Sequence, residues 1–157
     1  GRYGQIDLPE IYLREYEEKA CSACPYRHSR HQCRRQYPAQ LLQTAFYPLL
    51  PDDPNFSLQR GRIHEFFKYT KPHRKLLEEL ELVIIDEISM VRADIIDAVD
   101  RILRVYSRNL REPFGGKQIL LVGDVFQLEP VVKGDEREIL NRFYPTPYFF
   151  SARVFGR

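Results

Sequence analysis

The sequence predicts an α/β domain of three layers, in which helices flank a mainly parallel β-sheet. Two short apolar runs carry this prediction, residues 82–85 and residues 119–122, because neither alternates with polar residues. Such runs are typical of strands buried on both faces, as in a parallel sheet covered by helices. A helix-length segment with apolar residues three and four positions apart lies between them, at 91–107. This order of strand, helix and strand is that of a parallel βαβ unit.

Composition and length fit a single globular domain. The chain has 157 residues, which is long enough for one hydrophobic core. Its content of 43% hydrophobic and 29% charged residues excludes wholesale disorder. A formal net charge of +2 is nearly balanced and by itself points to no partner. There is no run of eighteen apolar residues and no signal-like start, so we expect a soluble, intracellular, cytoplasmic protein without a membrane partner.

Residues 1–45 form a divergent segment that contains all three cysteines. A short helix is predicted at 11–19, with Pro9 near its start. Cys21 and Cys24 have the spacing at which two thiolates share a tetrahedral zinc ion, and Cys33 and His28 would complete the set. A reduced, metal-free loop is the alternative, because one CxxC pair with this remaining spacing fits no standard zinc pattern. The odd cysteine count argues against a disulfide framework.

Helical pieces and a proline-rich loop are predicted before the first strand, and a long helix after it. The prolines of residues 41–56 exclude a long helix there, whereas 63–69 and 72–80 are predicted to be helical. Ser89 is the predicted cap of the helix at 91–107. The apolar stripe of this helix is predicted to face the core, and its charged residues are expected to face solvent: Asp94, Asp97, Asp100, Arg101 and Arg104.

The remaining elements complete the predicted domain. Gly115 and Gly116 predict a turn before the second strand. A short helix is predicted at 136–143, and Ser151 is the expected cap of a further helix.

Polar residues follow both predicted strands. Asp86 and Glu87 end the first, Gly123 and Asp124 end the second, and Gln127 comes shortly before Pro130. Ligands of open α/β sheets bind beyond the carboxyl ends of the strands. One carboxylate there suits a magnesium ion that keeps water and phosphate oxygens as its other ligands. A second carboxylate can orient or deprotonate the water that attacks a phosphate, and a glutamine can contact a γ-phosphate or position that water.

Two segments together resemble a known family. IIDEISMVRADIIDAVDRILR followed by GGKQILLVGDVFQLEPV is similar to the Walker B segment, the next helix and motif III of superfamily 1 DNA helicases. The resemblance is closest to the RecD-like branch typified by the petite-integration-frequency (PIF) helicases, and it is specific over residues 80–132. It implies a partial RecA-like domain of the P-loop NTPase type over 46–157.

The resemblance also implies a site and its partners. Asp86 would bind magnesium, Glu87 would act as base or position the water, and Gln127 would sense the γ-phosphate of ATP. Asp124 would add a supporting contact, and Gly123 would allow close backbone approach. The implied partner is DNA, single-stranded and at duplex junctions, and the implied processes are DNA repair and recombination.

The phosphate-binding loop of such enzymes is missing from the sequence. No GxxxxGK[ST] occurs, and the only Gly-Lys pair, Gly116-Lys117, follows the acidic motif instead of preceding it. We therefore expect part of an ATP-dependent DNA helicase that is inactive in isolation. In the intact protein it would be completed by a Walker A segment and a second RecA-like domain.

Two other interpretations stay open at this point. The chain could be a non-catalytic module that binds nucleic acid or protein, with a zinc site among the cysteines and a relic acidic motif. It could also be an unrelated α/β domain in which Asp86 and Glu87 only cap a helix.

Overall fold

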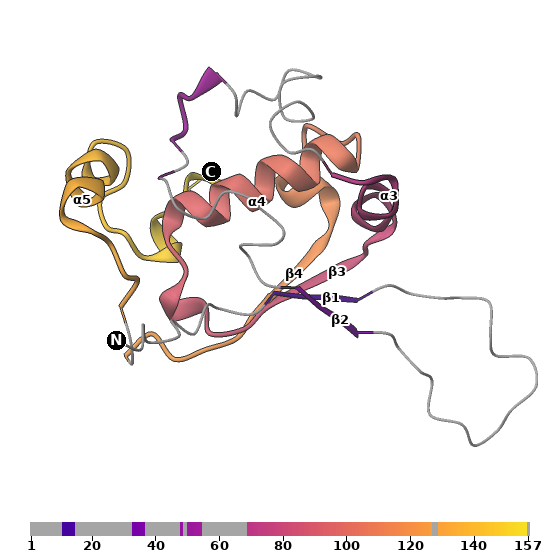
Figure 1. Ribbon diagram of the computed structural model, residues 1–157, viewed down its shortest axis with the longest axis horizontal. Helices are drawn as coiled ribbons and strands as arrows, with labels where there is room; N and C mark the ends of the chain where they lie inside the picture. Colours follow the sequence, from indigo (N-terminus) through magenta and orange to yellow (C-terminus); the bar gives the residue numbers. More distant parts are fainter. Residues whose placement is uncertain are drawn as a thin grey trace, which may run out of the picture.

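The computed structural model describes residues 11–14, 33–36, 48, 50–54, 69–126 and 129–156, the first two ranges by their backbone alone (Figure 1). The strands are β1 (Ile11–Arg14), β2 (Cys33–Gln36), β3 (Leu82–Ile85) and β4 (Gln118–Leu121). The α-helices are α3 (Lys71–Glu79), α4 (Ala93–Tyr106) and α5 (Gly134–Asn141). Short 3-10 helices span Ile88–Met90, Pro113–Gly116, Phe149–Ser151 and Arg153–Phe155.

The four described strands form one sheet in the order β2-β1-β3-β4. β3 and β4 are parallel, with Ile85 opposite Leu121, which confirms the predicted parallel pair. β1 runs antiparallel to both β2 and β3. The helix predicted at 11–19 is therefore wrong, because its first four residues, IYLR, form a strand. Aromatic and β-branched residues favour strands, and pairing with β3 satisfies backbone groups that would otherwise line an edge.

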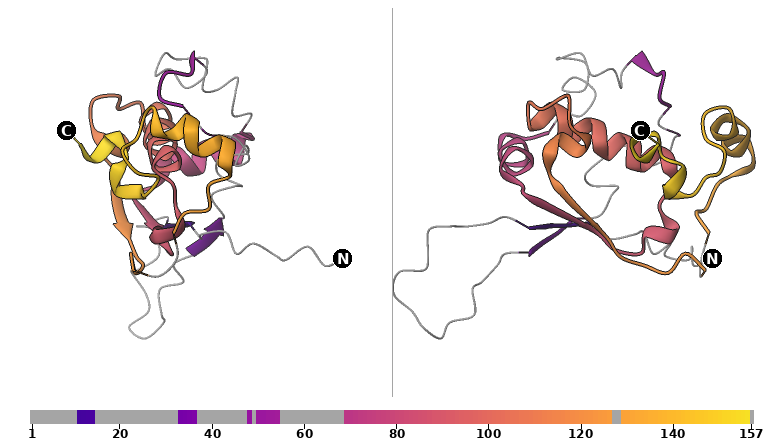
Figure 2. Two further views of the ribbon diagram at one scale, coloured as in Figure 1. Left: turned by 90° about the vertical axis from the view of Figure 1, so that its left-hand side faces the viewer. Right: turned by 180° about the vertical axis from the view of Figure 1, so that it is seen from behind.

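α4 lies over one face of this sheet and α3 packs beside it (Figures 1 and 2). The core forms where the apolar stripe of α4 meets β3 and α3, and Val83, Ile85 and Val99 are fully buried there. Burying such a side chain contributes about 1.5–3 kcal/mol relative to leaving it in water. β4 was predicted to be buried on both faces, but it is not: Leu120 is 47% exposed.

The charged side of α4 is buried, so the prediction that it faces solvent is wrong. Asp94, Asp97, Asp100 and Arg104 are each less than 10% exposed. Arg101, which is half-buried, donates a hydrogen bond to the carbonyl oxygen of Pro51 at 2.7 Å. The chain beyond α4 folds back over this side of the helix, and carboxylates can be buried there because protein donors meet them.

Asp97 binds the carboxyl-terminal part of the chain. Its carboxylate accepts hydrogen bonds from the Tyr144 hydroxyl at 2.9 Å and from the backbone amides of Arg153 at 3.1 Å and Val154 at 3.0 Å. One buried side chain thus fixes two separate stretches, around residue 144 and around residue 153, against α4.

Asp100 and Arg104 bind the turn that follows α4. Asp100 accepts hydrogen bonds from Arg104 Nε at 2.8 Å and from the backbone amide of Phe114 at 2.6 Å. Arg104 Nη1 donates to the carbonyl oxygen of Leu110 at 2.9 Å. The predicted turn at Gly115 and Gly116 is confirmed, with φ of +67° and +79°.

Two predicted helix caps differ from the structure. Ser89 is buried inside the 3-10 helix Ile88–Met90, and Arg92 occupies the N-cap position of α4 without a side-chain cap. Ser151 ends one 3-10 helix and pairs through its hydroxyl with that of Thr146, so it caps no further helix. The helix predicted at 136–143 is confirmed as α5, two residues earlier.

Candidate functional site at the strand ends

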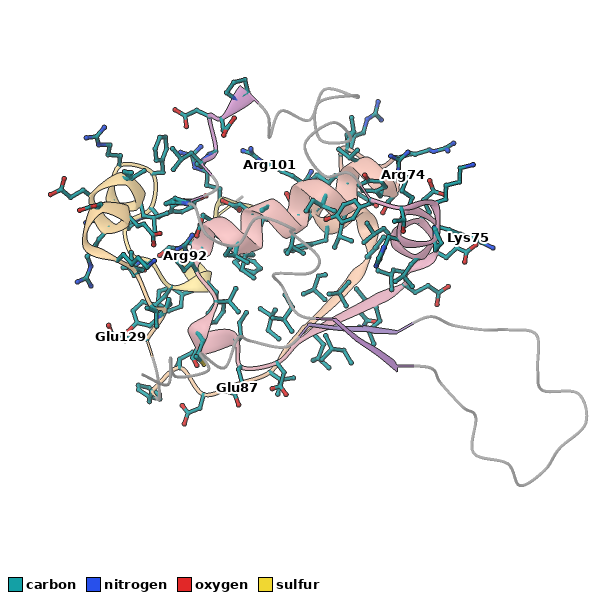
Figure 3. All side chains as sticks on the ribbon, in the orientation of Figure 1. Arg74, Lys75, Glu87, Arg92, Arg101 and Glu129 are labelled. Carbon is teal, nitrogen blue, oxygen red and sulfur yellow. The ribbon has the colours of Figure 1, made fainter. Side chains whose placement is uncertain are left out.

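The acidic pair directly follows β3, at its carboxyl end. The chain takes a left-handed conformation at Glu87, with φ of 52° and ψ of 44°, and then enters the 3-10 helix Ile88–Met90. The Glu87 amide donates a hydrogen bond to Asp86 Oδ1 at 2.9 Å. Asp86 is half-buried and Glu87 is exposed. Figure 3 shows Glu87 at the end of the sheet, away from α4. A left-handed glutamate is uncommon, and such residues are frequent at functional sites.

The end of β4 meets this acidic turn. The amide of Val122 donates to the carbonyl oxygen of Ile85 at 2.9 Å, and the amide of Ile88 donates to the carbonyl oxygen of Val122 at 3.0 Å. Gly123 follows with φ of +150°, and a Cβ atom at this position would lie 2.9 Å from the Ile88 nitrogen. Only glycine fits so close to another backbone. The structure therefore brings Gly123 against the backbone of Glu87 and Ile88.

Asp124 begins an exposed turn beyond β4. Its Oδ1 accepts a hydrogen bond from the amide of Phe126 at 2.9 Å, the local pattern of an Asx-turn. Phe126 is 95% exposed. Gln127 lies outside the described residues, so its contact with a γ-phosphate stays a prediction.

Oxygen ligands at this end of the sheet suit a hard cation with an open coordination sphere. In the described part of the chain, no three histidine, cysteine, aspartate or glutamate side chains converge on one point. A magnesium ion held by Asp86 would then take most of its ligands from water and phosphate, which is the binding mode magnesium favours with nucleotides.

The predicted zinc ligands are not described. Cys21, Cys24 and His28 lie outside the described residues, and Cys33 is described only as the first residue of β2, opposite Arg14. The zinc site stays a prediction.

The lone Gly-Lys pair serves the fold. Lys117 precedes β4, at the opposite end of the strand from Gly123, and its amino group donates hydrogen bonds to the carbonyl oxygens of Glu78 and Leu80. Burial lowers the pKa of Lys117. The lysine thus satisfies carbonyls at the end of α3, where helices leave such groups without partners.

Sequence reasoning missed Arg92, which lies five residues after Glu87. Its guanidinium binds Asp94 with two hydrogen bonds, at 3.0 Å from Nε and 2.8 Å from Nη2, and Glu136 with one, at 3.1 Å from Nη1. Burial lowers the pKa of Arg92, but the hydrogen bonds and charges of Asp94 and Glu136 outweigh it and raise that pKa overall. Arg92 and Glu136 are 44 positions apart, and no sequence pattern signals such a pair.

In the described part of the chain, no helix is long and apolar enough to cross a lipid bilayer.

Known proteins share these segments. A family model described as PIF1-like helicase matches residues 62–146. The ATP-dependent DNA helicase PIF1 of Saccharomyces cerevisiae is 35% identical over 100 residues, which are 62% of this chain and 11% of that protein. The ATP-dependent DNA helicase PIF1 of Emericella nidulans is 47% identical over 84 residues, 52% of this chain and 11% of that protein.

A solved structure matches as well. The crystal structure of Pif1 helicase from Bacteroides in complex with ADP-AlF3 and ssDNA superposes with a TM-score of 0.65 at 45% identity, over 76% of this chain and 25% of that chain. The predicted fold, part of a RecA-like domain, is confirmed. The chain spans about a tenth of the length of these curated relatives and about a quarter of the solved one.

Proposed function

Because the chain belongs to the PIF1-like helicase family, we propose that it is part of an ATP-dependent DNA helicase whose strand ends hold the magnesium ion and γ-phosphate of ATP. The observation that carries this proposal is the meeting of the acidic turn with Gly123 at the carboxyl ends of β3 and β4. Ligands of open α/β sheets bind at this edge. The solved Bacteroides relative is bound to both ADP-AlF3 and ssDNA.

Each strand-end residue has a proposed role. Asp86 is the magnesium ligand, since the Glu87 amide orients its carboxylate through Oδ1. The Glu87 carboxylate has no hydrogen-bond partner among the described residues and is exposed, so it has acceptor capacity for a water molecule. Gln127 contacts the γ-phosphate, and Asp124 shapes the turn that leads to it. A bound magnesium ion would neutralise charge on the phosphate oxygens.

In the proposed reaction Glu87 orients a water molecule and accepts its proton. The water oxygen forms a bond to the γ-phosphorus while the bond from that phosphorus to the β,γ-bridging oxygen breaks. ADP and inorganic phosphate leave, and Glu87 returns its proton to solvent. The position of Asp86 and Glu87 directly after β3 and the chemistry of phosphoryl transfer support these roles.

The chain alone is proposed to turn ATP over slowly or not at all. The backbone amides and lysine of a glycine-rich loop supply much of the stabilisation of the transferring phosphoryl group, and this sequence has no such loop. In the intact protein a Walker A segment and a second RecA-like domain would complete the site. The proposed substrate of the whole enzyme is single-stranded DNA and duplex junctions.

A titration with Mg-ATP tests the site. We expect weak binding by the natural chain, and binding at least about tenfold weaker in Asp86→Ala, because a lost charge-assisted ligand costs on the order of 1.4 kcal/mol or more. Asp135→Ala is the matched control, since it removes an exposed carboxylate in α5. Equal affinity in the natural chain and Asp86→Ala would contradict the proposal, as would no binding at all. Rapid turnover that Glu87→Gln abolishes would support the site and contradict the proposed slow turnover.

A second candidate function rests on the hairpin of β1 and β2. The pairing of Arg14 with Cys33 brings together the two ends of the segment that contains Cys21, Cys24 and His28. In this alternative the segment binds zinc and the chain is a non-catalytic module for nucleic acid or protein. Stoichiometric zinc in the purified protein, with unfolding on chelation, is the expected result. Absence of zinc from protein prepared with zinc in the medium would contradict it.

A further inference from the structure

The chain on both sides of Gln127 is anchored to the segment that begins with the acidic pair. On the first side, Val122 hydrogen-bonds with Ile85 and Ile88, and Gly123 lies against the Ile88 backbone. These contacts fix the end of β4 at the acidic turn. They do not involve the chain beyond Gln127, between Glu129 and the start of α5.

Glu136, in the first turn of α5, provides the anchor beyond Gln127. Its Oε2 accepts a hydrogen bond from the backbone amide of Lys133 at 3.4 Å and one from Arg92 Nη1 at 3.1 Å. The Arg92 side chain is 10% exposed and that of Glu136 16%. Arg92 is itself held by two hydrogen bonds to Asp94, which is fully buried. The start of α5 is thus tied to the residue at the N-cap position of α4.

Glu129 provides a second link to the same place. Its carboxylate hydrogen-bonds with the Tyr148 hydroxyl, and this bond raises the pKa of Tyr148. The backbone of Tyr148 forms an antiparallel bridge with Arg92, and the amide of Ala93 donates to the carbonyl oxygen of Pro147 at 2.9 Å. Figure 3 shows Glu129 and Arg92 on the same side of the molecule as α5. Residues 129–136 are therefore linked to Arg92 directly through Glu136 and indirectly through Glu129 and Tyr148.

The Arg92–Glu136 ion pair is better suited to fixing the arrangement of the chain than to stabilising the fold. A partly buried guanidinium and carboxylate lose solvation, so such pairs contribute little net stability even though they impose a defined arrangement. Arginine forms this arrangement better than lysine, because its planar fork binds two carboxylates in fixed directions. The pair connects a residue five positions after Glu87 to a residue nine positions after Gln127.

We infer that Arg92 and Glu136 are a positioning pair that holds the chain beyond Gln127 in a fixed place relative to Asp86 and Glu87. The inference rests on the proposed function, because holding this segment matters only if Gln127 contacts the γ-phosphate. It assigns neither residue a contact with nucleotide.

Native-state hydrogen exchange of the purified chain tests the pair without any nucleotide. In Glu136→Gln the charge is removed while Arg92 keeps Asp94 as its partner. We expect the amide of Lys133, which donates to Glu136, to exchange about tenfold faster, while those of β3 and α4 stay protected. Glu138→Gln, an exposed position in the same helix, is the matched control and should exchange as the natural chain does. Arg92→Lys should give an intermediate rate.

Unchanged exchange of the Lys133 amide in Glu136→Gln would overturn the inference. So would a uniform acceleration of all amides, because that would mark a general loss of stability. A parallel titration with Mg-ATP separates the two proposals. If the natural chain binds no Mg-ATP, the proposed function fails, whereas the exchange result still decides whether the pair holds this segment. If Mg-ATP binds normally to Asp86→Ala, the role proposed for Asp86 fails, and this outcome too is independent of the exchange result.

Discussion

Two groups of carboxylates lie in opposite surroundings in this molecule. Asp97 and Asp100 in α4 are buried and accept hydrogen bonds from tyrosine, arginine and backbone amides. Asp86 and Glu87 lie at the end of β3 and are more exposed. The one hydrogen bond described for their carboxylates is donated by the Glu87 amide to Asp86 Oδ1. Protein donors use up the acceptor capacity of the first group. The second group keeps its capacity for a ligand, and this difference marks the site.

The largest effect on stability is expected from a break in the buried group. Asp100→Ala leaves the Arg104 guanidinium buried without its carboxylate and the Phe114 amide without an acceptor. We expect the free energy of unfolding to fall by about 3–5 kcal/mol. Urea unfolding followed by circular dichroism measures this, with Glu79→Gln as a control that breaks an exposed pair with Lys75 and costs less than about 1 kcal/mol. Equal effects of the two variants would remove the distinction between buried and exposed carboxylates.

The contact between the two motif ends is tested at Gly123. Gly123→Ala would place a Cβ atom 2.9 Å from the Ile88 nitrogen at a φ of +150°, so we expect a loss of about 1–3 kcal/mol. Gly134→Ala is the matched control, because a Cβ atom there meets nothing within 4 Å. It should be neutral or slightly stabilising. Thermal unfolding of both variants would show whether the acidic turn depends on glycine at this one point.

A milder change in the buried group is Tyr144→Phe. It removes the hydroxyl that donates to Asp97 at 2.9 Å, while the amides of Arg153 and Val154 still bind that carboxylate. We expect a loss of about 1 kcal/mol, the typical net value of one hydrogen bond. A loss as large as that predicted for Asp100→Ala would mean that the backbone donors do not hold Asp97 by themselves.

Alkaline pH should lower the free energy of unfolding through the buried tyrosines. Burial raises the pKa of Tyr144, and the charge of Asp97 and its hydrogen bond add to this; burial also raises the pKa values of Tyr69 and Tyr106. Below about pH 10 these phenols keep their protons in both states and the stability is complete. Above it the unfolded chain loses protons first, so the free energy of unfolding falls as pH rises. Denaturant unfolding between about pH 9 and about pH 11 should show this fall, and Tyr144→Phe should make it shallower.

The smallest effect on stability is expected at the strand ends. Glu87→Gln changes an exposed side chain without a described partner, so the free energy of unfolding should change by less than about 0.5 kcal/mol. A loss of several kcal/mol, measured by the same urea titration, would place Glu87 with the structural carboxylates of α4.

The sequence allowed correct predictions wherever local patterns decide the structure. Apolar runs predicted β3 and β4, the spacing of apolar residues predicted α4, and the position of Asp86 and Glu87 after β3 followed at once. The buried side of α4 could not be predicted in this way. Asp97 and Arg104 have the spacing of a solvated helix face. They are buried because later parts of the chain return over that face, residues 144–154 at Asp97 and residues 110–114 at Arg104. The link between Arg92 and Glu136 is equally non-local.

The pairing of strands was predicted only in part. IYLREYEEK has the charges of an exposed helix, yet its first four residues supply an antiparallel neighbour for β3. Tertiary pairing outweighs local helix propensity in so short a segment.

Manganese is a paramagnetic replacement for magnesium, and adding it with ATP to isotopically labelled protein shows directly whether the strand-end carboxylates bind the metal. We expect the amide resonances of Asp86, Glu87 and Asp124 to broaden first, and Asp86→Ala to abolish this broadening. The amides of α4 around Asp97 and Asp100 should stay sharp. Broadening centred on α4, or broadening at the strand ends that persists in Asp86→Ala, would contradict the assignment of the strand-end carboxylates as the ligand-binding group.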